Sequence, residues 1–331
     1  MLTSNIRSVR AENHNPHDVR PVGSTNGRVP PGGYPSVSDR FAAFLTGFIE
    51  GEGSFSIGRN GRGFGFRPKM SLSARDDDAD LINALYDATR IGRVTRKRAY
   101  RSSEAQVVWT VSAKSDCLRL IDLIERAPLR GRKGAAYVPW KRAVAHWTAD
   151  GPTARLTPSD WQPFPGLKAD LERANRFNPE RSLEPIPFGT DMLPYLAGFA
   201  TAEGHFAIDK QLRPRFILRL RLDDQRLLAE LQAATCLGRV YGPYARSGNA
   251  GYPATMWVIF STPDLIELVR LFEQCAPGGR KGLEFAFWRQ AVLDRSQTAS
   301  ARRARLALVR ERLMGLRQYR SPSGALGTKG T

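Results

Sequence analysis

The sequence has few of the residues that form disulfide scaffolds, zinc sites and imidazole-based active sites. It contains 3 cysteines and 4 histidines in 331 residues. Cys117, Cys236 and Cys275 lack the spacing of metal ligands and cannot all pair with one another, which favours a reduced, intracellular protein. The histidines lack the neighbours that an HNH or zinc nuclease centre requires. We therefore expect a function that uses neither disulfides nor a histidine-based site.

Long apolar runs and acidic residues are also scarce. The sequence has no stretch of 18 apolar residues and no signal peptide, so we expect neither membrane insertion nor export. Asp and Glu together number 32 against 50 Lys and Arg, which gives a formal net charge of +18. This surplus favours a polyanionic partner, although ribosomal and membrane-surface proteins share it. P-loops, dinucleotide-binding glycine fingerprints and Ser-His-Asp patterns are absent as well.

Two short stretches of the chain are near copies of each other. Leu45-Thr-Gly-Phe-Ile-Glu-Gly-Glu-Gly53 is followed by Ser-Phe-Ser-Ile, and Leu196-Ala-Gly-Phe-Ala-Thr-Ala-Glu-Gly204 is followed by His-Phe-Ala-Ile. Each predicts a helix that ends at a glutamate and a glycine and continues directly into a strand. Small residues spaced four apart leave one helix face bare in each copy, at Gly47 and Gly51 and at Gly198 and Ala202. We expect these two helices to pack closely along their bare faces.

Parallel packing of the two helices would bring Glu52 and Glu203 together at one end. The helix dipoles already place partial negative charge there. At about 5 Å and an effective dielectric constant of about 20, two carboxylates repel by roughly 3 kcal/mol. Either a proton bound at a raised pKa or a divalent cation must offset this repulsion, and Mg²⁺ prefers oxygen ligands of this kind.

Both stretches resemble the signature of the LAGLIDADG homing endonucleases, of the single-chain, two-motif monomeric type. Each copy keeps the family's leucine, its first glycine, the acidic eighth residue and the final glycine. The resemblance implies a monomeric, intron-encoded endonuclease that makes a double-strand break with 3′ cohesive ends in double-stranded DNA. It also implies that Glu52 and Glu203 are catalytic and bind Mg²⁺, for which Mn²⁺ can substitute. Lys133 and Lys281 match the family's basic residue near this junction and are catalytic candidates, with a simple phosphate contact as their alternative role.

The chain departs from the family pattern in two ways. Glutamate replaces the more usual aspartate at both catalytic positions, which changes the reach of the carboxylate but not its charge. Thr201 stands where the first copy has Glu50 and where the family often has an acid, so we expect its hydroxyl to cap or pack instead. Two alternatives to a nuclease remain: an RNA maturase that binds its host intron RNA, and a noncatalytic nucleic-acid-binding protein. Because such proteins usually lose a junction acid and both acids are present here, the nuclease is favoured.

The duplication extends beyond the two signatures. Ile91-Gly-Arg-Val94 is echoed by Leu237-Gly-Arg-Val240, and Arg132-Lys-Gly134 by Arg280-Lys-Gly282. One repeat of this length predicts a tandem pair of domains and not a solenoid. The expected organisation is a disordered N-terminal segment (1–38), an N-terminal half (39–148), a linker with a short helix at 167–175 (149–189), a C-terminal half (190–296) and a basic C-terminal helix and tail (297–331).

Hydrophobic periodicity predicts the elements of each half. In the first half we expect strands at 54–58, 67–75, 94–100 and 107–112, a helix around 81–85 and another at 115–126. With the signature helix, this gives the order α-β-β-α-β-β-α, which recurs in the second half. The fold class is α+β, and the resemblance implies a pseudo-twofold pair with two central packed helices and antiparallel sheets that form a saddle.

Alternation along the strands places polar side chains on the sheet face opposite the helices. Such a face can donate hydrogen bonds to guanine and to phosphates, and its Asn, Gln and Ser groups can read adenine. For any one residue, a solvated sheet face without a ligand is the alternative. Because the halves differ at nearly all of these positions, we expect an asymmetric DNA target. The predicted DNA-contacting residues are Ser54, Ser56, Asn60, Arg62, Lys69, Ser71, Ser73, Arg75, Arg93, Thr95 and Lys97, and His205, Asp209, Gln211, Arg213, Arg215, Arg219, Arg221, Arg239 and Tyr241.

Overall fold

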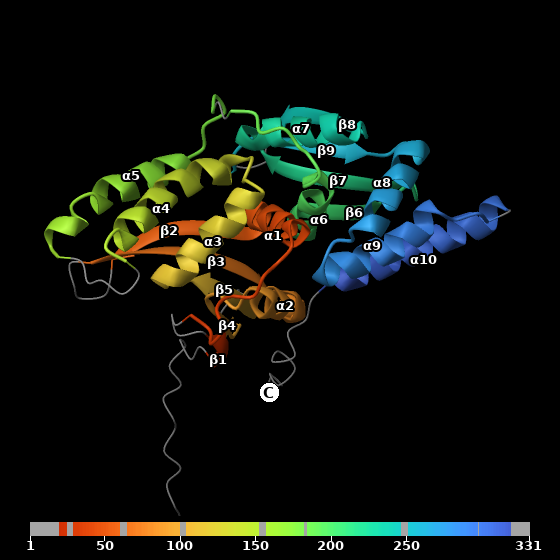
Figure 1. Ribbon diagram of the computed structural model, residues 1–331. Helices are drawn as coiled ribbons and strands as arrows, with labels where there is room; N and C mark the ends of the chain where they lie inside the picture. The colour runs from red at the N-terminus through yellow and green to blue at the C-terminus, as the bar shows by residue number, and fades with distance from the viewer. Residues whose placement is uncertain are drawn as a thin grey trace, which may run out of the picture.

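The chain folds twice into the same order of helices and strands (Figure 1). The computed structural model describes the backbone of residues 20–24 and residues 29–59, 65–99, 104–151, 157–181, 184–245, 251–296 and 298–318. The first half contains α1 (Asp39–Glu52), β2 (Gly53–Arg59), β3 (Phe66–Arg75), α2 (Ala79–Thr89), β4 (Arg93–Lys97), β5 (Gln106–Val111), α3 (Lys114–Arg126), α4 (Arg132–Thr148) and α5 (Phe164–Asn175). The second contains α6 (Met192–Glu203), β6 (Gly204–Ile208), β7 (Pro214–Arg221), α7 (Gln225–Thr235), β8 (Arg239–Tyr244), β9 (Ala254–Ile259), α8 (Thr262–Gln274), α9 (Gly279–Val292) and α10 (Ala299–Arg317).

Each half forms an antiparallel sheet with the same strand order. The order is β4-β5-β3-β2 in the first sheet and β6-β7-β9-β8 in the second, which is the same order read in the opposite direction. The first sheet gains a fifth strand, because β1 (Arg20–Ser24) pairs antiparallel with β4. This strand lies within the segment 1–38 that the sequence predicts to be disordered. The predicted α+β class and the duplicated antiparallel sheets are confirmed.

The two signature helices lie side by side at the centre of the molecule. Ser38 caps α1 by accepting a hydrogen bond from the Phe41 backbone N at 3.1 Å. A β-carbon added at Gly47 would lie 2.0 Å from the Tyr195 backbone O, and one added at Gly198 would lie 1.9 Å from the Phe44 backbone O. The two backbones therefore touch where the side chains are absent, as the bare faces predict.

Each half has its own hydrophobic core between the sheet and its helices. Fully buried tryptophans anchor both cores, Trp109 and Trp140 in the first half and Trp257 and Trp288 in the second. The core of the first half also contains three residues of α5, and the core of the second contains three residues of α10: Phe164, Leu167 and Leu171, and Leu306, Val309 and Leu313. These apolar residues attach both helices to their halves.

Helices α5 and α10 are counterparts in the two halves. The first packs on α4 and the second on α9, and they lie at opposite ends of the molecule in Figure 1, coloured green and blue. The sequence predicts a short helix within the linker and a basic helix in the tail, but their equivalence was not expected. In both segments apolar residues recur at helical spacing, and this pattern could have indicated that each segment is a helix packed on its own half. Among the described helices, none is both long and apolar enough to cross a membrane.

Candidate active site

Glu52 and Glu203 are the last residues of α1 and α6, and the packing of these helices brings the two together. A β-carbon added at the adjacent Gly51 would lie 2.1 Å from Ala202 Cβ and 3.3 Å from Glu203 Cγ. Glu52 remains exposed to solvent, whereas Glu203 is partly buried. Within the described part of the chain, no hydrogen bond or ion pair involves either carboxylate. Two neighbouring carboxylates without partners form a site that attracts cations.

The pKa values of the two carboxylates reflect this crowding. Partial removal from water and, second, the charge of Glu52 together raise the pKa of Glu203 to about 7, against the opposing effects of Lys133, Arg132 and Lys281. The pKa of Glu52 is also raised, first by loss of water, with Lys133 and Lys281 again opposing the shift. Both acids and both lysines therefore share one electrostatic environment at the junction of the two halves.

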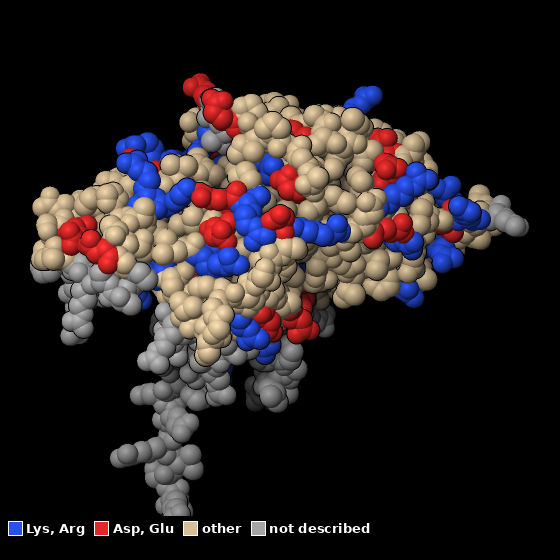
Figure 2. Space-filling view, in the orientation of Figure 1, with Lys and Arg blue, Asp and Glu red and all other residues tan. Residues whose placement is uncertain are grey.

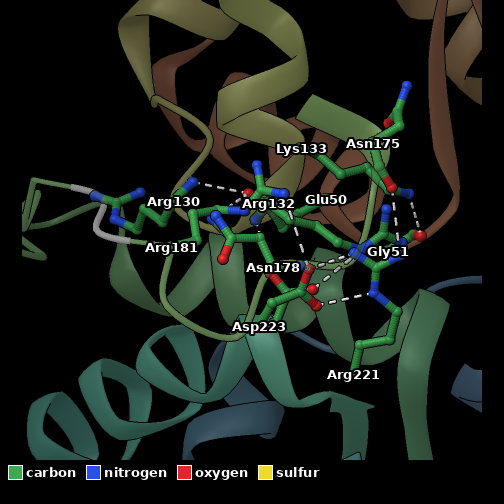
Figure 3. Close-up of polar contacts among 12 residues, drawn as sticks. Glu50, Gly51, Arg130, Arg132, Lys133, Asn175, Asn178, Arg181, Arg221 and Asp223 are labelled. Carbon is green, nitrogen blue, oxygen red and sulfur yellow. Dashed lines mark hydrogen bonds and ion pairs between the residues drawn. The ribbon is translucent and has the colours of Figure 1, made fainter. Parts of the chain in front are cut away.

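Lys133 lies in the first turn of α4 and is buried, with 7% of its surface exposed. Its Nζ donates to the backbone O of Gly51 and, at 3.5 Å, to that of Ile49, so it lies beneath the end of α1 (Figure 3). Burial lowers the pKa of Lys133 to about 8, and the neighbouring Arg132 lowers it as well. A lysine held next to the acid pair with such a pKa can be a cation or a neutral amine near neutral pH.

Lys281 occupies the equivalent position in α9 but has different neighbours. Its Nζ lies 3.6 Å from Oε1 of Glu284, whose side chain is fully buried. The same carboxylate accepts a hydrogen bond from Arg280 and forms an ion pair of 3.0 Å with Arg317 of α10. Burial lowers the pKa of Lys281, and the Glu284 charge opposes that shift.

The helix that carries Lys133 is capped by residues from both halves. The backbone N atoms of Arg130 and Gly131 donate to Oε2 of Glu50, at 2.7 and 3.1 Å. The backbone N of Arg132 donates to Oδ1 of Asp224, from the second half, at 2.6 Å. These carboxylates satisfy backbone N–H groups that the first turn of a helix leaves unpaired.

The helix that carries Lys281 is capped in the mirrored way. The backbone N of Gly278 donates to the Thr201 hydroxyl at 2.8 Å, so Thr201 caps as expected from its place in the signature. The backbone N of Arg280 donates to Oδ1 of Asp78, from the first half, at 2.6 Å. The helix that carries each candidate lysine is therefore capped by an aspartate of the opposite half.

Sequence reasoning missed the roles of Asp78 and Asp224. By their place after the second strand of each half, these acidic residues indicate only favourable charge at a helix N-terminus. A repeated pattern was available, because Arg75-Asp-Asp-Asp78 corresponds to Arg221-Leu-Asp-Asp224 at a constant offset. The pattern alone did not show that the last aspartate of each copy reaches across to the other half.

Most of the predicted DNA-contacting residues lie at the surface of the two sheets. Ser54, Lys69, Arg93, Lys97, His205, Gln211, Arg213, Arg219 and Arg239 are exposed, and Ser56, Ser71, Ser73, Arg215 and Tyr241 are partly exposed. Asn60 and Arg62 lie outside the described residues. The first strand pairs with the second in both halves, Ser56 opposite Lys69 and His205 opposite Ile217, so these side chains share one face.

Several of the predicted DNA-contacting residues are buried or already have partners within the protein. Thr95 is 5% exposed, in the strand that β1 covers. Asp209 organises the β6–β7 turn by accepting from the backbone N atoms of Gln211 and Arg213 and pairing with Arg215 at 2.8 Å. Arg75 and Arg221 each pair with the aspartate two residues later, Asp77 and Asp223.

Arg221 is also held by the segment that joins the halves. Its guanidinium carbon lies 5.6 Å from the ring centre of Phe177 and 5.0 Å from that of Tyr252, and these rings stack on each other. Its Nη1 donates to the Asn175 backbone O at 3.4 Å, at the end of α5 (Figure 3). Arg75 donates in the same way to the Arg317 backbone O at 3.3 Å, at the end of α10. These two arginines connect each sheet to the other half's outer helix.

A hollow next to the acid pair leaves room for a metal ion. A hollow of about 240 Å³ opens beside Glu52 and is lined by residues of both halves, among them Ser73, Asp78, Thr201 and Arg280. A more apolar hollow of about 460 Å³ lies away from the acids, between α3, α4 and residues 184–186. No cluster of three or more Asp, Glu, His or Cys that could enclose a metal occurs in the described ranges. Two carboxylates without partners fit Mg²⁺, which commonly takes one or two carboxylates together with phosphate and water.

Charge is distributed unevenly around the molecule. On the side that Figure 2 shows, Lys and Arg are mixed with Asp and Glu, and no patch of one sign dominates it. The exposed residues of the sheets, by contrast, include six basic side chains: Lys69, Arg93, Lys97, Arg213, Arg219 and Arg239. The partly exposed Asp209 already forms ion pairs with Arg213 and Arg215. A polyanion would therefore be attracted to the sheet face.

Comparison with known proteins agrees with this geometry. Residues 45–144 match the family model described as LAGLIDADG endonuclease. This segment, which contains the first signature, is therefore similar to the LAGLIDADG endonucleases. The family resemblance of the first signature is thereby confirmed, and the second signature lies outside the matched residues. None of the curated proteins matches this chain.

Solved structures share the fold of this protein over most of its length. The LAGLIDADG homing endonuclease I-GzeII, in complex with its DNA target, is 18% identical with a TM-score of 0.63, covering 83% of this chain and 98% of its own. The meganuclease I-AabMI, bound to uncleaved DNA, is 20% identical with a TM-score of 0.61 over 82% and 98%. I-SmaMI, bound to uncleaved DNA target in the presence of calcium ions, is 16% identical with a TM-score of 0.61 over 85% and 98%. At these identities, the likeness establishes the fold.

Proposed function

We propose that this protein is a site-specific DNA endonuclease that cuts both strands of a long, asymmetric target and leaves 3′ cohesive ends. The observation that carries the proposal is the acid pair. Glu52 and Glu203 meet at the junction of the halves with no hydrogen-bond or ion-pair partner among the described residues, and a candidate lysine lies near them on each side. A noncatalytic protein gains nothing from two adjacent carboxylates, which repel each other by roughly 3 kcal/mol at about 5 Å and an effective dielectric constant of about 20.

The junction residues divide the work of phosphodiester hydrolysis. Glu52 and Glu203 would hold divalent metal, Mg²⁺ or Mn²⁺, which when bound activates water and neutralises charge on the phosphate. Lys133 and Lys281 would each stabilise the phosphate of one strand and orient the attacking water. Because Gly51 O and Ile49 O fix Lys133 in place, its ammonium needs little rearrangement to act. Each half would thus cut one strand.

The sheet face supports double-stranded DNA as the substrate. Exposed Arg219, Arg239 and Lys69 suit guanine edges and phosphates, and the structural neighbours named above were solved with DNA. One chain supplies two halves with different contact residues. This favours action as a monomer on a target without twofold symmetry.

Replacing either junction acid tests the proposal. A cleavable site is first selected from a randomised duplex library in Mg²⁺, and cutting and binding are then measured on that duplex. We expect Glu52→Gln and Glu203→Gln to abolish cleavage while binding is kept or tightened, because the substitution removes a repelling charge. Glu267→Gln, which removes an exposed carboxylate paired with Arg270 on α8, serves as the control. EDTA should stop cutting by the wild type.

Two results would refute the assignment. One is unchanged cutting by both acid variants. The other is a wild-type protein that binds duplex DNA or intron RNA but cuts no selected site in Mg²⁺ or Mn²⁺, which would instead favour the maturase or a binding-only protein.

A further inference from the structure

We propose that Glu284 and Arg317 are positioning residues for Lys281, and that they control cleavage of one DNA strand without affecting the other. The inference rests on the proposed nuclease function and adds a specific device in the second half. It makes the two cutting centres unequal, although their acids and lysines are duplicated.

The device is a buried ionic cluster at the start of α9. Glu284 has no exposed surface, and its Oε1 lies 3.6 Å from Lys281 Nζ and accepts from Arg280. Its Oε2 accepts from Nη2 of Arg317 at 3.0 Å and from Nε at 3.3 Å. One carboxylate thus holds the candidate catalytic lysine on one oxygen and α10 on the other.

Arg317 is fixed from three directions. Its Nη2 also donates to the Phe206 backbone O in β6 at 2.6 Å, one residue after His205 on the sheet face. Its own backbone O accepts from Arg75 of the first half. Leu313, one turn earlier, is buried in the core of the second half. The end of α10 is therefore anchored to the sheet, to the core and to the opposite half at once.

The described residues of the first half form no such cluster around Lys133. The residue of α4 that corresponds to Glu284 is Ala136, three positions after Lys133, and it is buried in the core. Lys133 donates instead to backbone oxygens at the end of α1. Since α4 folds with alanine at this place, the helix itself does not require a glutamate.

The cost of burying Glu284 points to a positioning role. A buried carboxylate gives up several kcal/mol of hydration, which its ion pairs only partly restore. Apolar residues of similar size often fill such sites without loss of stability. The cluster also aligns the lysine ammonium, and a displacement of about 1 Å at a reacting centre can lower the rate by roughly 100-fold.

Strand-specific cleavage kinetics test the proposal. Each strand of the selected duplex carries its own end label, and single-turnover rates are measured at saturating protein. We expect Lys281→Ala and Lys133→Ala to slow opposite strands. Glu284→Gln and Arg317→Ala should slow the Lys281 strand by roughly 10- to 100-fold and leave the other strand and the DNA affinity unchanged. Equal slowing of both strands by Glu284→Gln, or slowing of the Lys133 strand alone, would overturn the proposal.

A second measurement does not depend on nuclease activity. The rate at which a small acylating reagent modifies each lysine is read by mass spectrometry on the folded, DNA-free protein. We expect Glu284→Gln and Arg317→Ala to accelerate modification of Lys281 several-fold while Lys133 is unchanged. The matched control is Glu273→Gln in α8, which removes the exposed ion-pair partner of Arg289, a residue of α9 like Lys281. It should change the modification rate of neither lysine. Unchanged labelling of Lys281 would refute the positioning role whether or not the protein cuts DNA, whereas a wild type that never cuts refutes only the proposed function.

Discussion

At the scale of single residues, the acid pair makes the folded protein sensitive to pH. The pKa of Glu203 is raised from 4.5 to about 7, mainly by partial loss of water and then by the charge of Glu52. A carboxyl group whose pKa rises on folding binds its proton more tightly in the folded state. Its ionisation therefore costs stability, which is lost progressively as the pH rises from about 4.5 through about 7 and is not recovered above that range.

This sign predicts that removing the charge stabilises the metal-free protein. In EDTA at pH 8, we expect Glu203→Gln to raise the free energy of unfolding by on the order of 2 kcal/mol. The gain should vanish at pH 4, where the wild-type carboxyl is protonated in both states. Thermal or urea unfolding at the two pH values measures the difference. The control Glu267→Gln should show no such pH dependence, and an equally large gain at pH 4 would show that the charge is not the cause.

The same shift predicts how the metal requirement depends on pH. Because Mg²⁺ must displace the proton of Glu203 below pH 7, its apparent affinity should weaken as the pH falls, by up to about tenfold per unit. Titration of cleavage with Mg²⁺ at pH 6, 7 and 8 measures the half-saturating concentration. We expect a steep change between pH 6 and 7 and a shallower one above. A constant value across this range would mean that Glu203 is already ionised.

At the scale of elements, the contact between α1 and α6 depends on two glycines. Alanine at Gly47 or Gly198 would place its methyl group within 2.0 Å of a backbone oxygen of the other helix. Because backbone atoms cannot move aside as a flexible side chain can, we expect each substitution to destabilise the protein by about 3 kcal/mol and to abolish cleavage. Urea unfolding measures the loss. Gly166→Ala in α5 is the matched control, since a methyl there meets nothing within 4 Å, and it should be neutral or mildly stabilising.

The crossed caps predict an effect that appears in the half opposite the mutation. Replacing Asp224 by alanine removes the acceptor for the Arg132 backbone N and should destabilise the first turn of α4, at a cost of about 1 kcal/mol. Hydrogen exchange should rise at residues 131–134, although Asp224 belongs to the second half. Asp78→Ala should act in the same way on residues 279–282 of α9. Asp87→Ala, which removes a surface partner of Arg90, should leave both helices unchanged.

At the scale of the whole molecule, the sequence predicted whatever depends on local pattern or on duplication. Bare helix faces predicted the central contact, and strand alternation predicted the sheets, because both follow from residues close together in the chain. The caps that Asp78 and Asp224 provide depend on how the two halves pack against each other. The alternation of polar and apolar residues along a strand does not predict this packing. Glu284 was missed for a related reason: its partner Arg317 lies at the end of a helix expected to be a tail.

The predicted DNA-contacting residues also divide into those that local pattern placed correctly and those whose surroundings depend on how the halves pack. Alternation placed Lys69, Arg219 and Arg239 on the surface correctly. It could not anticipate that Arg75 and Arg221, at the ends of their strands, pair with aspartates and with the ends of α10 and α5. These two arginines serve to hold the halves together, so substitutions there should change stability as well as any DNA contact.

Salt dependence measures whether the sheet face contacts DNA. Arg219 is exposed in β7, opposite Met256 in β9, and none of the described ion pairs or hydrogen bonds involves its side chain. If it neutralises a phosphate, Arg219→Ala should weaken binding to the selected duplex and lower the slope of log affinity against log salt by about 1. Binding of the wild type, this variant and Arg289→Ala, a helix-side control paired with Glu273, is measured from 50 to 300 mM salt. We expect the control to keep the wild-type slope. A loss of affinity by Arg219→Ala that is equal at every salt concentration would contradict a phosphate contact, because releasing one fewer counterion must change the slope.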